Sequence, residues 1–211
     1  MKLRIDVLRH GESTLSHTLR GSTDDVLTTK GQLQMQQTVD DFITQSVVPM
    51  MWQGIFSSPL QRCQSFAQQL STQYCTPLIL EQGVQEIHFG AWEAKPMQWI
   101  YENFPDQLSQ FWQTPTEFTP PNAESIWQFQ SRVLAAMTHI QTQMMENHWH
   151  QVLLVTHGGV IKLLKCLAMQ KNLDDILTIS AELGTLHHFE FDTNAKTIHL
   201  LSDFIEKDHL K

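Results

Sequence analysis

The chain of 211 residues is 41% hydrophobic and 17% charged, a composition that suits one compact globular domain with a well-formed core. Its 22 acidic and 14 basic residues give a net charge of -8, which disfavours nucleic acid and anionic membranes as main partners. The 3 cysteines are odd in number and widely spaced, so they indicate reduced thiols and not a disulfide framework. Neither a secretory signal pattern nor a membrane-spanning apolar run is visible, and we therefore expect a soluble cytoplasmic protein.

The first part of the chain alternates between predicted strands and helices. Apolar residues alternate in "KLRIDVL" and predict a buried strand that ends near His10. A helical pattern begins within "VLTTKG", with Thr28 as its N-cap. The segment "GIFSSP" predicts a short strand and then a helix that Ser58 caps, with Pro59 in the first turn. A further short strand is predicted by "PLIL" at residues 77–80.

The second part begins with a change of composition. From about residue 92 to 123, tryptophan, phenylalanine and proline interrupt the regular pattern, so we expect an irregular or short-helical insertion that lies over the domain as a lid. A long helical pattern runs from about residue 124 to 147. The strongest strand pattern, "QVLLVT", follows at residues 151–156 and leads through "HGG" into another helix. Two apolar segments on either side of Asp192 predict a closing hairpin.

This order of elements predicts an α/β fold, because strands that alternate with helices normally form a mostly parallel sheet. We expect a three-layer sandwich, in which a mostly parallel central sheet carries helices on both faces. Residues 1–211 should form a single domain, with the helical or irregular lid insertion at about 92–123.

Three predicted strand ends carry unusual polar side chains, namely Arg9 with His10, Arg62, and His157. In open α/β sheets the functional site lies beyond the carboxyl ends of the strands, so we expect these groups to meet. Two guanidinium groups could bind a phosphate dianion through paired hydrogen bonds, and the helix start near Arg62 also favours an anion. A neutral histidine beside them is a competent nucleophile if its second ring nitrogen donates to a fixed carbonyl. The pattern therefore predicts a phosphate pocket.

Five motifs, in this order, resemble those of the histidine phosphatase superfamily, also called the phosphoglycerate mutase-like superfamily. The likeness covers most of the chain, and the motifs read "LRHGES", "GSTDDVLTTKG", "SSPLQRC", "QEIHFGAWE" and "VTHGG". The resemblance implies that His10 takes up the phosphoryl group as a phosphohistidine, and that Arg9, Arg62 and His157 bind its oxygens. It also implies that Glu86 protonates the leaving oxygen and later deprotonates the attacking water.

The same resemblance assigns Ser16 and Gly158 to the phosphate site. Ser16 stands where the family usually has asparagine, and its hydroxyl can replace one hydrogen bond. Ala94 and Ala123 stand at two positions where the family usually has glycine. No metal or other cofactor is expected, since no carboxylate cluster with magnesium-binding character accompanies the arginines.

Within the superfamily, "FGAWE", the tryptophan-rich segment and "PNAES" resemble the α-ribazole-5'-phosphate phosphatases of cobalamin nucleotide-loop assembly. The resemblance implies a small phosphorylated metabolite as the partner, with α-ribazole 5'-phosphate as the favoured substrate. The aromatic cluster fits two interpretations. Such rings commonly form a small packing core, and alternatively Trp92 and Trp99 belong to a lid that stacks on the substrate.

Two other functions stay open. A phosphoglycerate mutase would use the same phosphohistidine, but the insertion offers only Lys95 for a second anionic group of the substrate. A non-catalytic phosphate-binding adaptor would normally lack the nucleophile or an arginine, and this chain has all of them. The sequence also leaves open whether the chain forms a homodimer.

Overall fold

The computed structural model describes residues 1–45, 52–195 and 197–201. At its centre lies a 6-stranded sheet in the order β4-β3-β6-β1-β7-β8. The strands are β1 (Lys2–Arg9), β3 (Gly54–Ser57), β4 (Leu78–Leu80), β6 (Gln151–Thr156), β7 (Leu186–Asp192) and β8 (Thr197–Leu201). The pairs from β4 to β1 are parallel, whereas β7 and β8 pair antiparallel. The predicted mostly parallel sheet and the closing hairpin are therefore confirmed.

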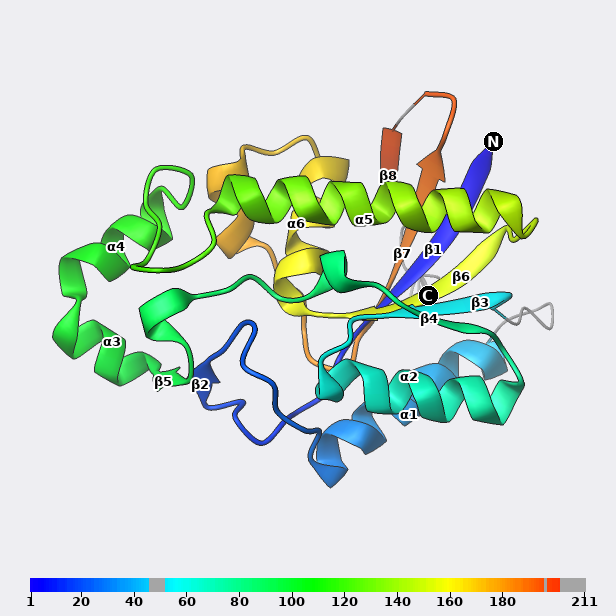
Figure 1. Ribbon diagram of the computed structural model, residues 1–211, viewed down its shortest axis with the longest axis horizontal. Coiled ribbons are helices and arrows are strands. Elements are labelled where there is room, and N and C mark those ends of the chain that lie inside the picture. Colours follow the sequence, from blue (N-terminus) through cyan, green and yellow to red (C-terminus); the bar gives the residue numbers. More distant parts are fainter. Residues whose placement is uncertain (46–51, 196, 202–211) are drawn as a thin grey trace, which may run out of the picture.

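Helices cover both faces of this sheet (Figure 1). The two pairs are α1 (Thr29–Gln45) with α2 (Gln61–Tyr74), and α5 (Ile126–Glu146) with α6 (Gly158–Ala168). The strand β6 shows why both faces are covered, because its side chains alternate between two apolar cores. Leu153 and Val155 pack into the core with α1 and α2, whereas Val152 and Leu154 pack into the core with α5 and α6. The predicted three-layer sandwich is confirmed.

Two predicted helix starts have different outcomes. Thr28 caps α1 as expected, since its Oγ1 accepts a hydrogen bond of 3.0 Å from the N–H of Gly31. The expected cap of α2 was wrong. This helix begins at Gln61 with Leu60 as its N-cap, and the Ser58 hydroxyl accepts only a 3.3 Å hydrogen bond from the Leu60 N–H. Ser58 lies too far upstream to cap the helix, and its hydroxyl serves a histidine described below.

Three short 3₁₀ helices connect the larger elements and lead toward the functional site. They are η1 (Gln82–Val84), η2 (Gly90–Trp92) and η3 (Leu173–Thr178). Among the helices in the described part of the chain, none is long and apolar enough to cross a membrane.

The insertion between η2 and α5 consists of β5 (Lys95–Pro96), α3 (Met97–Asn103) and α4 (Pro105–Gln113). It lies at one end of the molecule, where β5 pairs with β2 (Thr18–Leu19) in a second, 2-stranded sheet (Figure 1). Its centre is Trp92, whose ring is fully buried and lies 5.7 Å from the ring of Phe111. The aromatic residues therefore hold the insertion to the sheet as a packed core.

Candidate active site

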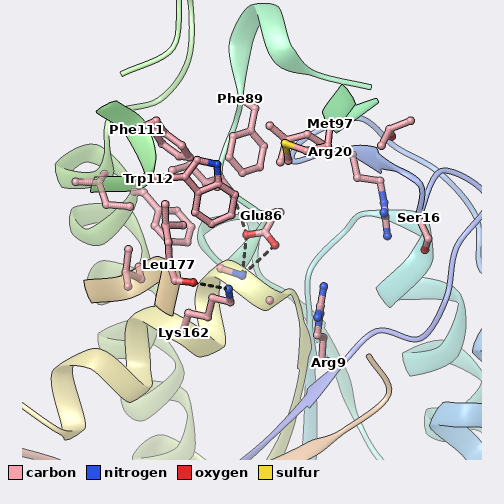
Figure 2. A pocket seen from close by; sticks show the side chains of 18 of the residues that line it. Arg9, Ser16, Arg20, Glu86, Phe89, Met97, Phe111, Trp112, Lys162 and Leu177 are labelled. Atoms are coloured by element: carbon pink, nitrogen blue, oxygen red, sulfur yellow. Dashed lines mark hydrogen bonds between the residues drawn. The ribbon is translucent and has the colours of Figure 1, made fainter. Parts of the chain in front are cut away.

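A cavity of about 260 Å³ lies beyond the carboxyl ends of β1 and β6. Figure 2 shows side chains of the sheet ends and of the insertion pointing into it. The structure brings five predicted site residues together in its lining, which are Arg9, His10, Ser16, Glu86 and Gly158. This is the edge of an α/β sheet where functional groups are expected to gather.

His10 follows the last residue of β1 and is almost fully buried. Its Nδ1 atom lies 2.8 Å from the carbonyl oxygen of Gly11. Because a carbonyl can only accept, Nδ1 carries the proton and Nε2 keeps its lone pair. Burial holds the pKa of His10 well below its usual value, and the charges of Arg62 and Arg9 lower it further. The imidazole is therefore neutral and nucleophilic at neutral pH.

The glycine of the "RHGE" motif has a packing reason. A Cβ added to Gly11 would lie 2.1 Å from the carbonyl oxygen of Gly31 in the first turn of α1. A Cβ added to Gly31 would likewise lie 1.9 Å from the carbonyl oxygen of Glu12. Both glycines are needed for the backbone after β1 to rest on α1, and this contact fixes the position of His10.

Arg9 lies in the wall of the cavity beside the start of α6. One of its terminal nitrogens donates to the carbonyl of Ala181, and its buried Nε atom has no hydrogen-bond partner among the described residues. A Cβ on Gly158 would come within 3.0 Å of the guanidinium, so the missing side chain of this glycine leaves room for Arg9. A buried, unpaired guanidinium donor beside a neutral imidazole is the arrangement expected of a site for an anion.

Arg62 and His157 stand close to this group but do not line the cavity. The ring of His157 lies 5.3 Å from the ring of His10, and its Nε2 lies 2.7 Å from the Ser58 hydroxyl. Arg62 is fully buried in α2 and donates to the carbonyls of Gly21 and Thr23 at 2.6 and 2.8 Å. Burial and the charge of Arg62 keep the pKa of His157 well below its usual value.

Glu86 enters the cavity from the segment after η1. Both carboxylate oxygens accept from the N–H of Gly159 at the start of α6, at 3.0 and 3.1 Å. A Cβ on Gly159 would lie 2.2 Å from the Glu86 Oε1 atom, so the second glycine of "HGG" makes room for the carboxylate.

Arg132 of α5 holds the segment that carries Glu86. Its guanidinium donates to the carbonyls of Gly83, Gln85 and Glu86 at 2.8 to 3.0 Å. The same group pairs with Glu124 of the "PNAES" motif at 2.6 Å. The late motif therefore supports the acid from behind and does not itself line the cavity.

Glu93 of "FGAWE" has a structural task that the sequence did not reveal. Its carboxylate accepts hydrogen bonds from the N–H groups of Gly21, Ser22, Thr23 and Phe89, and from the Thr23 hydroxyl. Burial alone would raise the pKa of Glu93, but these hydrogen bonds lower it below its usual value. The carboxylate holds in place the loop whose carbonyls bind Arg62.

The expectation that Trp92 and Trp99 stack on a substrate needs correction. Trp92 is fully buried against phenylalanine rings, and Trp99 packs beside Phe104 under the Lys95 ammonium. Neither ring lines the cavity. Both belong to the core of the insertion. The sequence could not reveal this, because an irregular segment has no periodicity that distinguishes buried from exposed rings. The rings that line the cavity are Phe89, Phe111, Trp112 and Phe129.

Two cations in the lining were missed, Arg20 and Lys162, whereas the expected Lys95 lies outside it. Lys162 lies in the second turn of α6, and no signal in the sequence indicated that it would point into the cavity. Arg20 directly precedes the "GSTDD" motif, but its contact with the cavity depends on how that loop folds.

Comparison with known proteins shows the family to which the chain is similar. Residues 5–203 match the model of the histidine phosphatase superfamily, branch 1. Phosphoserine phosphatase 1 of Hydrogenobacter thermophilus is 22% identical over 78% of this chain and 75% of its own length. The α-ribazole phosphatase of Shigella flexneri has a similar structure, with a TM-score of 0.77, 20% identity and coverage of 94% of this chain and 95% of that one.

A mycobacterial glucosyl-3-phosphoglycerate phosphatase has the same fold, with a TM-score of 0.78, 18% identity and coverage of 95% of this chain and 97% of that one. Identities this low show the fold and leave the substrate open. The family model spans nearly the whole chain and includes all five motifs. The chain therefore belongs to the histidine phosphatase superfamily.

Proposed function

We propose that this protein is a phosphomonoesterase that works through a phosphohistidine on His10. The observation that carries the proposal is the hydrogen bond between Nδ1 of His10 and the Gly11 carbonyl, which leaves Nε2 free to attack. The lowered pKa of His10 keeps this atom unprotonated. Few other functions would explain a buried neutral imidazole surrounded by guanidinium groups.

In the first step, Nε2 of His10 forms a bond to phosphorus while the bond from phosphorus to the ester oxygen breaks. Glu86 gives its proton to that oxygen, so the alcohol leaves uncharged. In the second step, water attacks the phosphohistidine, Glu86 takes a proton from the water, and the bond from nitrogen to phosphorus breaks. Inorganic phosphate is released and both residues return to their starting states.

Arg9, Arg62 and His157 would stabilise the three equatorial oxygens of the phosphoryl group during both steps. Phosphoryl transfer needs positioning and neutralisation of spread negative charge more than covalent chemistry. Arg9 already offers an unpaired buried donor, and Gly158 lies directly against it. Ser16 lines the same side of the cavity and can add one hydroxyl contact.

The favoured substrate is α-ribazole 5'-phosphate, a benzimidazole riboside with one phosphate. The cavity joins a cationic side to a wall that includes Phe89, Phe111 and Trp112, and flat aromatic bodies stack well on such rings. The "FGAWE" and "PNAES" motifs, which resemble those of the α-ribazole-5'-phosphate phosphatases, support the same choice. The test below compares its turnover with that of substrates used by other members of the family.

The test has two parts. Rapid quench with labelled substrate should trap an acid-labile, alkali-stable phosphoramidate on His10, and His10→Ala should lose both the label and nearly all activity. A panel of phosphomonoesters should give α-ribazole 5'-phosphate a kcat/KM at least about a hundredfold above those of 3-phosphoglycerate and phosphoserine. Full activity of His10→Ala would contradict the mechanism, and faster turnover or isomerisation of 3-phosphoglycerate would contradict the substrate.

A further inference from the structure

Arg20 lies in the cavity lining and has no role in the mechanism above. Its side chain is only 9% exposed, and Nε donates to Asp25 Oδ1 at 3.1 Å. The two terminal nitrogens have no hydrogen-bond partner in the described part of the chain. A guanidinium has five N–H donors, so four of them remain available to a ligand.

Asp25 fixes the direction of this guanidinium. Its Oδ1 atom also accepts from Arg62 at 3.0 Å, and its Oδ2 atom accepts from the Leu15 N–H at 3.0 Å. The carboxylate is nearly fully buried, so both arginines are held with little freedom. Because Arg62 and Leu15 already satisfy Asp25, Arg20 is not needed to neutralise it.

The charges around the cavity do not balance without a ligand. Arg9, Arg20 and Lys162 line the cavity and Arg62 lies beside it, whereas the nearby carboxylates are those of Asp25, Glu86 and Glu182. Burial lowers the pKa of Arg20, and the charge of Asp25 raises it. The charges of Arg62 and Arg9 lower this pKa further, so the three guanidinium groups lie close enough to repel one another. The charge of Arg20 also lowers the pKa values of His10 and His157. Such a surplus of positive charge suits a dianion.

Figure 2 shows where Arg20 would act. It lies beside Ser16 on the side of the cavity that also holds Arg9, whereas Lys162, Trp112 and Leu177 occupy the other side. The guanidinium of Arg20 therefore lies on the side of the cavity where Arg9 and Ser16 would hold the phosphate. The Glu93 carboxylate supports this position, since it anchors the loop that begins at Gly21.

We propose that Arg20 is a phosphate-binding residue, a third guanidinium that contacts the oxygens of the phosphomonoester dianion together with Arg9 and Arg62. This inference rests on the proposed function and adds to it the recognition of doubly charged phosphate. Since the contact is to the phosphate, it acts on every phosphomonoester alike.

The experiment compares Arg20→Met and Arg20→Lys with the wild-type protein. The readouts are KM and kcat for p-nitrophenyl phosphate and the inhibition constant of inorganic phosphate. Arg20→Met should raise KM and this inhibition constant at least about tenfold, and Arg20→Lys should recover only part of the loss because it cannot bind through two donors. Lys171→Met removes an exposed cation away from the cavity and should match the wild type.

Three outcomes decide the inference. Values of KM and of the inhibition constant within about twofold of wild type in Arg20→Met, with unchanged thermal unfolding, would overturn it. A loss confined to α-ribazole 5'-phosphate would also overturn it, because Arg20 would then contact the substrate body. If the wild type shows no turnover and no phosphohistidine, the proposed function fails, and calorimetric binding of inorganic phosphate to wild type and Arg20→Met still decides the role of Arg20.

Discussion

The two sides of the cavity are built in different ways. The cationic side consists of Arg9, His10, Ser16 and Arg20, which come from the end of β1 and the loop after it. Hydrogen bonds to buried backbone or carboxylate groups fix all four of these side chains. The aromatic side consists of Phe89, Phe111, Trp112 and Phe129, which come from the start of η2, from α4 and from α5.

Packing alone positions the aromatic side. The rings of Phe89 and Phe111 meet edge to face at 6.2 Å, and Trp112 is 46% exposed at the rim. Hydrogen bonds are directional, so the cationic side can hold a reacting group in one geometry. Apolar contacts tolerate changes of shape, so the aromatic side can vary with the body of the substrate. The first side suits the chemistry and the second suits selectivity.

The largest effect is expected at Glu86, which lies between the two sides (Figure 2). Glu86→Gln keeps the size of the side chain but cannot transfer a proton, so kcat/KM for α-ribazole 5'-phosphate should fall about 10² to 10⁴-fold. The loss for p-nitrophenyl phosphate should be much smaller, because its leaving group needs little protonation. Equal losses on both substrates would assign the acid to another residue.

A second prediction moves Glu86 without replacing it. In Gly159→Ala, the new Cβ would lie 2.2 Å from Oε1 of Glu86, so the carboxylate must leave its place at the start of α6. A displacement of this kind should lower kcat for alkyl phosphates on the order of 10²-fold. The inhibition constant of inorganic phosphate should change little, because Arg9 and His10 stay in place. A matching loss of phosphate affinity would mean that the cationic side depends on Glu86.

A third prediction concerns selectivity on the aromatic side. Trp112→Ala should lower the kcat/KM of α-ribazole 5'-phosphate relative to p-nitrophenyl phosphate by about tenfold, since stacking on one ring contributes about 1 to 3 kcal/mol. The matched control is Trp127→Ala, which removes a somewhat more exposed indole that does not line the cavity. Identical ratios in both variants would show that Trp112 does not touch the substrate.

A fourth prediction is that acid destabilises the cationic side. Burial is the main cause that lowers the pKa of His187, beside Arg9, from 6.5 to about 3, and burial lowers those of His10 and His157 in the same direction. Below pH 6.5 the unfolded chain therefore binds more protons than the folded protein, so the free energy of unfolding should fall as the pH drops from 6.5 toward 3.

Each of these histidines adds up to about 1.4 kcal/mol per pH unit to that slope. Chemical denaturation at a series of pH values measures it, and His187→Gln should reduce the slope by one proton. A free energy of unfolding that stays constant between pH 6.5 and 4.5 would contradict the lowered pKa values.

The smallest effect, a change in the free energy of unfolding, is expected at Ala94, where the segment after η2 leads into the insertion. Ala94 has a φ of 57°, in the left-handed region that favours glycine, and it stands where the family usually has glycine. Ala94→Gly should relieve this strain and raise the free energy of unfolding by up to about 1 kcal/mol. Thermal or chemical unfolding measures the gain, and kinetics should not change. A loss of stability would mean that the alanine methyl group makes a favourable contact.

The contrast between the cationic and the aromatic side of the cavity explains which parts of the structure could be predicted from the sequence. His10 and Arg9 could be placed because a buried strand pattern ends at them, and strand ends of a parallel sheet meet at one edge. Arg20 was missed because its position depends on Glu93, which is distant in sequence and binds the loop through backbone groups. Hydrogen bonds to backbone N–H groups leave no trace in the residue types of the loop.

In the insertion, the sequence revealed which residues are unusual but not where their side chains lie. Its aromatic residues were recognised, but Trp92 and Trp112 look alike in the sequence although one is buried in the core and the other lines the cavity. Short helices such as α3 and α4 have too few turns for a reliable apolar face. The roles proposed for Glu86, Arg62 and His157 stay predictions until the variants are measured.

The Glu93 carboxylate and the pairing of β2 with β5 mark a boundary in the chain. Up to Pro96, backbone and carboxylate hydrogen bonds tie the insertion to the loop that holds Arg62. After Pro96, α3 and α4 touch the cavity through apolar side chains such as Met97 and Phe111. Replacing residues 97–121 by the matching segment of another family member should therefore change the apolar part of the cavity lining, while the hydrogen-bonded part that includes Arg9, His10 and Arg20 stays in place.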